Sequence, residues 1–285
     1  MTRSHFDPVS TVTNPTIRVG IGGWHYQPWR NNFYPAGLPQ KRELHYASRK
    51  LDAIEIDSTF YRAQRPATFA RWRDETPDDF MFSLKATMFC TNRRVLAESG
   101  ESIGWFINSG IAELQHKLGP IVWQFAPTKQ FDPVDFEAFL KLLPREADGM
   151  VLRHALDVRH ESFRSAEYLQ LARRYGATTV YTDSDEYPAI GDVTGSFVYL
   201  RLRRASAEWA AGFKDDVFAQ LAACARCWRD GDEPGGVPRI EPVPPLVAPR
   251  DVFVFVINGA KEKAPAAAMA LRSELDPLGQ AFDPM

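Results

Sequence analysis

Short apolar runs, rich in β-branched and aromatic residues, alternate along this chain with longer segments in which apolar residues recur at helical spacing. This alternation is typical of parallel strands joined by covering helices. Eight runs fit strands: Ile17 to Gly22, Ala53 to Phe60, Phe80 to Ala86, Pro120 to Phe125, His154 to His160, Thr178 to Asp183, Phe197 to Arg203 and Val252 to Asn258. Seven segments fit helices: Gln40 to Lys50, Pro66 to Asp74, Ser102 to Lys117, Pro133 to Leu143, Ser165 to Tyr175, Lys214 to Arg229 and Pro265 to Glu274. The pattern predicts an α/β fold, a TIM-like (β/α)8 barrel.

One connection departs from this regularity. The segment between the sixth and seventh runs contains Pro188, Gly191 and Gly195 and is too short for a full crossover helix, so we expect a shortened or irregular sixth return. The Pro- and Gly-rich segment Gly231 to Arg250 predicts a surface loop before the last strand. We expect a flexible N-terminal tail over residues 1–15 and a single domain over residues 16–285.

Alternate residues of a strand face opposite sides, so each run can be divided into an apolar face and a polar face. In the second run, Ile54 and Ile56 share one face, and Glu55, Asp57 and Thr59 share the other. The same division gives polar positions in later strands: Ser83, Lys85, Gln124, Asp157, Arg159, Tyr199, Arg201, Arg203 and, at the end of the eighth, Asn258. Barrel enzymes build their active sites at the carboxyl ends of their strands, so the pattern predicts a polar pocket there. Buried ion pairs among these residues are the competing structural explanation.

Composition limits the partners of such a pocket. The chain has 285 residues, of which 45% are hydrophobic and 25% charged, enough apolar material for one large core. Because 34 Lys and Arg face 36 Asp and Glu, the formal net charge is -2, and no global positive field favours extended binding to nucleic acid or an anionic membrane. Any anion site must therefore be local.

The three cysteines, Cys90, Cys224 and Cys227, do not suggest a secreted disulfide framework. Cys224 and Cys227 form a C-x-x-C within a predicted helix, but no second pair completes a zinc site. We expect no metal and no cofactor. No apolar signal segment or membrane-length run is found, so the expected location is the cytoplasm, without a membrane partner.

Several motifs together resemble the YecE-like family, also called domain of unknown function 72. They are Gly22-Gly23-Trp24-His25-Tyr26, Trp29, Phe33-Tyr34-Pro35, Ile54-Glu55-Ile56-Asp57-Ser58-Thr59-Phe60-Tyr61, Trp72 with Thr76-Pro77, Phe82-Ser83-Leu84-Lys85, Leu118-Gly119-Pro120 with Gln124, Arg159-His160, Tyr199-Leu200-Arg201, and Asn258 before Ala264-Pro265. The resemblance covers roughly Ile17 to Leu275 and implies a TIM-barrel-like fold, but no established reaction, substrate or cofactor. The chain departs from the family pattern at four positions. Asp57 stands where the family usually has Asn, and Asp157 where it usually has Glu. Arg203 stands where the seventh strand commonly continues into His-Gly, and Gly259 where a second Asn commonly follows.

The leading functional hypothesis is that the chain is an enzyme acting on a small or terminal anionic substrate of the phosphate type. The reaction class considered for it is hydrolysis by carboxylate acid/base chemistry. Glu55, Asp157 and His160 are the candidate catalytic residues, because carboxyl and imidazole groups exchange protons. The candidate substrate-binding residues are Trp24, Tyr26, Asp57, Thr59, Tyr61, Lys85, Gln124, Arg159, Arg201, Arg203 and Asn258. Arginine suits phosphate and carboxylate oxygens geometrically.

Two alternatives stay open. Glu55 and Asp157 could be the acid and nucleophile of a glycoside hydrolase, with Trp24, Trp29 and Tyr61 stacking on sugar. The chain could instead be a non-enzymatic module that binds a phosphorylated ligand or a nucleic-acid end through Arg201, Arg203 and Arg204.

Overall fold

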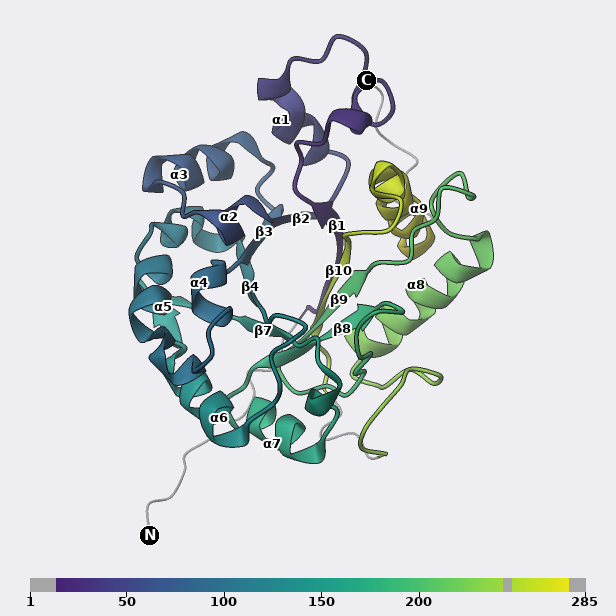
Figure 1. Ribbon diagram of the computed structural model, residues 1–285. Helices are drawn as coiled ribbons and strands as arrows, with labels where there is room; N and C mark the ends of the chain where they lie inside the picture. The colour runs from purple at the N-terminus through teal and green to yellow at the C-terminus, as the bar shows by residue number, and fades with distance from the viewer. Residues whose placement is uncertain (1–13, 243–247, 277–285) are drawn as a thin grey trace.

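Eight parallel strands close into a barrel in the computed structural model, which describes residues 14–242 and 248–276 (Figure 1). Around the barrel the strand order is β1-β10-β9-β8-β7-β4-β3-β2. The strands are β1 (Ile17–Gly22), β2 (Ala53–Ile56), β3 (Met81–Lys85), β4 (Leu118–Gln124), β7 (His154–Asp157), β8 (Thr178–Asp183), β9 (Phe197–Leu202) and β10 (Asp251–Val256). The predicted TIM-like (β/α)8 fold is confirmed. The small hairpin of β5 (Glu146–Ala147) and β6 (Met150–Val151) precedes β7.

Helices surround the strand ring (Figure 1). The longer ones are α3 (Pro66–Glu75), α5 (Gly100–Ile107), α6 (Pro133–Leu142), α7 (Ala166–Arg174), α8 (Asp215–Arg229) and α9 (Ala264–Leu275). The shorter ones are α1 (Glu43–Ala47), α2 (Ser58–Tyr61), α4 (Met88–Thr91) and the 3-10 turns η1 (Gln27–Trp29), η2 (Gln40–Arg42), η3 (Leu96–Ser99), η4 (Ile111–Lys117), η5 (Glu161–Phe163) and η6 (Lys261–Lys263). None of the described helices combines the length and the hydropathy that a membrane crossing requires.

Several predicted elements have different bounds in the structure. The helix expected over Gln40 to Lys50 is η2 followed by the short α1, and the fifth strand, expected to reach His160, ends at Asp157. The second strand was expected to reach Phe60 but ends at Ile56, because the chain turns into α2 and the Thr59 hydroxyl donates to the Ile56 carbonyl at 3.0 Å. The helix expected over Ser102 to Lys117 is divided into α5 and η4, because Gly110 has a φ of 101° that ends the helical path.

The irregular sixth return is confirmed in the described residues, since 184–196 join β8 to β9 without a helix. The described parts of the predicted loop over Gly231 to Arg250 contain no helix or strand, and its residues 243–247 lie outside the described residues. Residues 1–13 of the predicted tail lie outside them as well.

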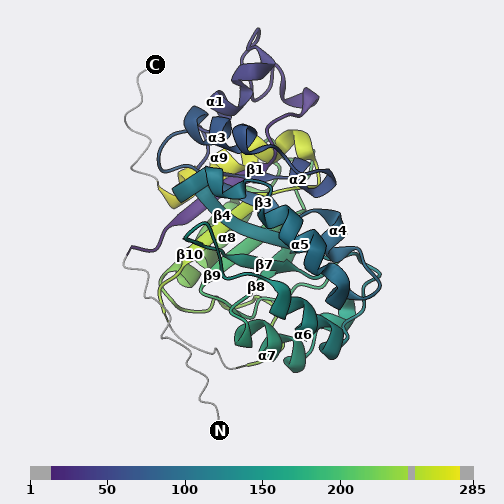
Figure 2. The same cartoon turned by 90° about the vertical axis from the view of Figure 1, so that its left-hand side faces the viewer.

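The apolar core has two layers that leave room for polar groups at one end of the barrel. The larger layer lies between the strands and the helices. The smaller layer fills the barrel interior and includes Val122, Val180, Phe253 and Phe255. The Tyr199 ring stacks on Phe255, with centroids 5.1 Å apart, and its hydroxyl begins the polar layer. Helices α2 and α4 directly follow β2 and β3 and lie at the same, carboxyl end of the barrel (Figure 2).

Candidate functional site

Arg201 lies at the centre of a group of polar side chains inside the carboxyl half of the barrel. Its guanidinium, 1% exposed, donates to Glu55 Oε1 at 2.7 Å, to Asp157 Oδ2, and to Gln124 Oε1 at 3.2 Å. We call the group formed by Glu55, Asp57, Lys85, Gln124, Asp157, Arg159, Tyr199, Arg201 and Arg203 the central cluster. The faces expected from the sequence bring these residues together from β2, β3, β4, β7 and β9, with Asp57, Arg159 and Arg203 just beyond the ends of β2, β7 and β9.

Asp157 is shared by two arginines. Its Oδ2 accepts from Arg159 Nη2 at 2.9 Å and from Arg201, and Arg159 Nη2 also donates to Gln124 Oε1 at 2.7 Å. Burial opposes ionisation of Asp157, but the charges of Arg159 and Arg201 outweigh it and hold its pKa below the ordinary value. Asp157 therefore stays ionised and orients the two guanidinium groups, which makes it a poor proton acceptor at neutral pH.

Glu55 has the opposite electrostatic character. Burial raises its pKa above the ordinary value, and the negative charge of Asp57 adds to that effect, although Arg201 and Tyr199 oppose it. The Tyr199 hydroxyl donates to Glu55 Oε2 at 2.6 Å and lies 2.7 Å from Ser83 Oγ. Glu55 is fully buried, so it can store a proton but does not reach the solvent-facing end of the cluster.

Asp57 and Lys85 stand at the solvent-facing end, which we call the mouth. Lys85 Nζ lies 3.8 Å from Asp57 Oδ1 and 4.1 Å from the centre of the Phe60 ring. The Asp57 side chain is 31% exposed, against 0% for Glu55 and Asp157, so Asp57 is the carboxylate of the central cluster that solvent molecules can reach. The Thr59 hydroxyl bonds the backbone carbonyls of Ile56 and Lys85, which fixes α2 to β3.

Arg159 and Arg203 meet at Tyr187 on the other side of the mouth. Their guanidinium carbons lie 4.6 and 5.0 Å from the centre of this ring. Arg203 Nη2 also lies 3.8 Å from Glu186 Oε2, but the Glu186 side chain is 70% exposed, so this ion pair holds Arg203 only weakly. Burial, and then the positive charges of Arg159 and Arg201, lower the pKa of Arg203.

Five other predicted site residues have surroundings different from those of the central cluster. Trp24 packs against Trp72 in the outer core, with ring centroids 5.0 Å apart, and Tyr26 packs against Trp29. His160 Nδ1 accepts from the Ser162 amide at 3.2 Å, so it caps the turn η5. Tyr61 is 69% exposed on α2, and Asn258 is exposed after β10. No described contact joins these five residues to the cluster.

Sequence reasoning missed Tyr187 and Thr182, and it named Ser83 as a polar strand position without counting it among the candidate site residues. Tyr187 lies in the helix-free connection after β8, where no periodic pattern predicts the direction of a side chain. Thr182 Oγ1 lies 3.4 Å from Asp157 Oδ1, and its inward position could have been read from the alternation of β8.

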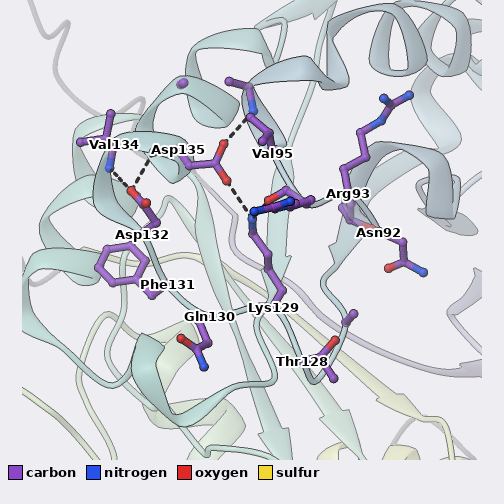
Figure 3. A pocket seen from close by; sticks show the side chains of 15 residues that line it. Asn92, Arg93, Val95, Thr128, Lys129, Gln130, Phe131, Asp132, Val134 and Asp135 are labelled. Atoms are coloured by element: carbon purple, nitrogen blue, oxygen red, sulfur yellow. Dashed lines mark hydrogen bonds and ion pairs between the residues drawn. The ribbon is translucent and has the colours of Figure 1, made fainter.

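A groove of about 1020 Å³ lies beside the cluster, between the connections that follow β3 and β4 (Figure 3). Its lining includes Thr91, whose hydroxyl donates to the Gln124 carbonyl at 2.6 Å, and Lys129, which pairs with Asp135 at 2.8 Å. Among the described residues, no group of three His, Cys, Asp or Glu side chains is arranged to hold a metal ion.

The model of the family described as protein of unknown function DUF72 matches residues 18–284 of the sequence. The chain belongs to the DUF72 family. This confirms the resemblance found in the motifs, and it leaves the reaction undefined because the family description names none.

Relatives of this DUF72 chain agree with that assignment. UPF0759 protein YecE of Escherichia coli K12 is 27% identical over 150 residues, which cover 52% of this chain and 50% of that protein, so the chain spans about half the length of this curated relative. UPF0759 protein YunF of Bacillus subtilis is 26% identical over 116 residues, covering 39% of this chain and 40% of that protein.

Solved structures support the fold. A DUF72 family protein of Thermotoga maritima superposes with a TM-score of 0.69 at 19% identity, over 92% of this chain and 99% of the other. A DUF72 family protein of Enterococcus faecalis superposes with a TM-score of 0.67 at 16% identity, over 94% of this chain and 97% of the other.

Proposed function

We propose that the central cluster is the active site of an enzyme that binds the phosphate or carboxylate group of a small substrate between Lys85, Arg159 and Arg203. The reaction class that fits is hydrolysis with carboxylate acid/base chemistry. The observation that carries the proposal is an excess of positive charge at the mouth.

This excess follows from the pairing within the cluster. Four cations of the cluster, Lys85, Arg159, Arg201 and Arg203, face its three carboxylates, Glu55, Asp57 and Asp157. The further carboxylate near Arg203, that of Glu186, is 70% exposed and offsets little of this charge. Burial lowers the pKa of Lys85, and the charge of Arg201 lowers it further. Burial lowers the pKa of Arg203 too, and the charges of Arg159 and then Arg201 add to that effect. A bound anion would offset this repulsion, which supports an anionic ligand over a neutral one.

The arrangement also divides the work among the residues. Asp157 and Gln124 orient Arg159, so that its guanidinium is held in place before the substrate arrives. Asp57, as the exposed carboxylate, would contact the substrate and move a proton at its reacting oxygen. Glu55 would act behind Arg201 as a positioning residue whose protonation adjusts the charge of the cluster. The proposed proton-transfer role thus falls to Asp57, and no longer to Glu55 or Asp157, the carboxylates that the sequence had suggested as catalytic.

Titration with inorganic phosphate, followed by calorimetry and by ³¹P resonance, tests anion binding. We expect Arg203→Gln to weaken binding by about ten- to a hundredfold, because one charge-assisted contact is worth about 1.5–3 kcal/mol. Arg204→Gln is the matched control, since Arg204 pairs with Asp183 and Asp185 outside the cluster. Equal affinity in the two variants would rule out this site.

A screen of phosphate monoesters and other small esters tests the enzymatic part. We expect Asp57→Asn to abolish turnover while phosphate still binds, and Glu55→Gln to change the pH profile. Phosphate binding without turnover of any ester would instead favour a binding module for a phosphorylated ligand.

A further inference from the structure

The missing sixth helix leaves part of the barrel wall open. In a barrel of this class, each connecting helix covers the outer face of a strand. Described residues 184–196 contain no helix, yet they cover the first half of β8, where the Thr179 amide donates to Thr194 Oγ1 at 2.7 Å. The second half of the same outer face, with Tyr181 and Asp183, lines a cavity of about 720 Å³ instead. We call it the lateral cavity.

The lateral cavity has an apolar wall. Val217, Leu221 and Cys224 project from successive turns of α8, and Phe213 and Val237 come from the loops on either side. A cavity of this volume, lined by aliphatic and aromatic groups, has the size and character of small-molecule sites. Its apolar wall favours a ligand with a compact hydrophobic body.

Trp209 is presented to this cavity by a tight loop. The Ser206 amide donates to the Gly212 carbonyl at 2.7 Å, and the Gly212 amide donates to the Trp209 carbonyl at 3.0 Å. Gly212 has a φ of 80°, a conformation that glycine adopts without strain. The indole is still 38% exposed although the loop that carries it is hydrogen-bonded. A planar ligand could cover this ring without reordering the loop.

The charges of the lateral cavity are unbalanced. Arg204 pairs with Asp183 at 3.2 Å, whereas Lys214 Nζ lies over the Trp209 ring at 5.1 Å. In the part of the chain that the structure describes, no carboxylate lies within ion-pair distance of Lys214. An anionic group on the ligand would therefore find a cation beside the indole.

We propose that the lateral cavity binds a small amphipathic anion, an aromatic body that carries one carboxylate or sulfonate group. The body packs between Trp209 and the apolar face of α8, and the acid group pairs with Lys214. This site is separate from the central cluster, because Arg203 faces Tyr187 in the mouth while the next residue, Arg204, faces outward to Asp183. The inference thus goes beyond the proposed enzymatic function.

Two fluorescent probes of nearly the same shape test the proposal. 8-Anilino-1-naphthalenesulfonate carries the acid group, and N-phenyl-1-naphthylamine lacks it. We expect Lys214→Met to weaken binding of the sulfonate probe five- to tenfold and to change binding of the neutral probe less than twofold. Lys214→Arg, which keeps the positive charge, should retain the affinity of the parent protein for the sulfonate probe. Trp209→Leu should weaken both probes. Lys261→Met is the control, because Lys261 Nζ lies 5.2 Å from the Tyr26 ring outside the cavity.

Cysteine protection locates the probe within the folded protein. Cys224 lines the lateral cavity, while Cys227 lies on the same helix outside its lining. The sulfonate probe should slow N-ethylmaleimide modification of Cys224 relative to Cys227, and excess phosphate should not displace it. Absence of sulfonate binding, equal affinities of Lys214→Met and the parent protein, or no protection of Cys224 would each overturn the proposal. Displacement by phosphate would assign the probe to the central cluster and overturn it too.

Discussion

Arg201 on β9 reaches across the barrel axis to Glu55 on β2, with Nη2 and Oε1 2.7 Å apart, although β10 and β1 separate these strands in the barrel wall. Its other nitrogen pairs with Asp157 on β7. One buried guanidinium therefore links three strands that are not neighbours, and it pairs with two carboxylates that have no contact with solvent.

Arg201→Met should strongly destabilise the fold, because it leaves the buried Glu55 without its main cation and the buried Asp157 paired with Arg159 alone. We expect a loss of about 3–5 kcal/mol in the free energy of unfolding. Urea unfolding followed by circular dichroism measures it. Adding Glu55→Gln to this variant removes one of the two charges and should recover part of the loss.

Arg204→Met provides the control for this experiment. Arg204 is half exposed, and its change should cost less than about 1 kcal/mol. A similar loss in the Arg201 and Arg204 variants would show that the central ion pairs do not stabilise the barrel.

Gly22 and Gly20, two positions apart on β1, should respond differently to alanine. A Cβ on Gly22 would lie 3.0 Å from Asp57 Oδ2, the movable end of a side chain. A Cβ on Gly20 would lie 2.1 Å from the Ala53 carbonyl oxygen, which is fixed in the sheet. We expect Gly22→Ala to cost under about 1 kcal/mol and Gly20→Ala about 3 kcal/mol or more, measured by urea unfolding. Equal losses would contradict the position of Asp57 over Gly22.

The alternation within strands was enough to predict most of the central cluster. Glu55, Asp157 and Arg201 could be assigned to the barrel interior because a strand has a period of two and their neighbours are apolar. The same reasoning predicted the barrel, since eight apolar runs with helical returns have few other ways to pack.

Residues in the connections, more than two positions from a strand end or after a sharp turn, could not be placed in this way. Trp24 follows Gly23, whose φ of 69° turns the chain toward the outer core, and nothing in the sequence gives the direction of that turn. Tyr187 reaches the mouth through a connection without periodic structure. His160 was equally suited to catalysis or to capping, and only its distance to the Ser162 amide distinguishes the two.

The N-terminus of α6 depends on one side chain, that of Asp132 beside the groove of Figure 3. Its carboxylate accepts from the amides of Val134 and Asp135 at 2.9 and 3.1 Å. Asp132→Ala should lower the free energy of unfolding by about 0.5–2 kcal/mol, and Asp132→Asn, which keeps an acceptor, should lower it by much less. Thermal unfolding of the three proteins measures this, and equal melting temperatures for Ala and Asn would contradict the capping role.

His154 should make the protein sensitive to mild acid. Its Nδ1 accepts from the Trp123 indole at 3.0 Å, so Nε2 carries the proton and donates to the Pro144 carbonyl at 2.7 Å. Burial lowers the pKa of His154 from 6.5 to about 4. Between these values the unfolded chain binds a proton that the folded protein excludes, so the stabilisation is complete above pH 6.5 and is lost as the pH falls toward 4.

The shift corresponds to about 3 kcal/mol, since each pKa unit is worth about 1.4 kcal/mol. Urea unfolding at a series of pH values between 7 and 4 should show that the parent protein loses this amount relative to His154→Gln, which cannot take up the proton. His116→Gln, at a histidine whose side chain is mostly exposed, is the control for a His-to-Gln change elsewhere in the chain. Parallel curves for the parent and His154→Gln would mean that His154 titrates alike in the folded and unfolded states, and that burial does not keep it neutral.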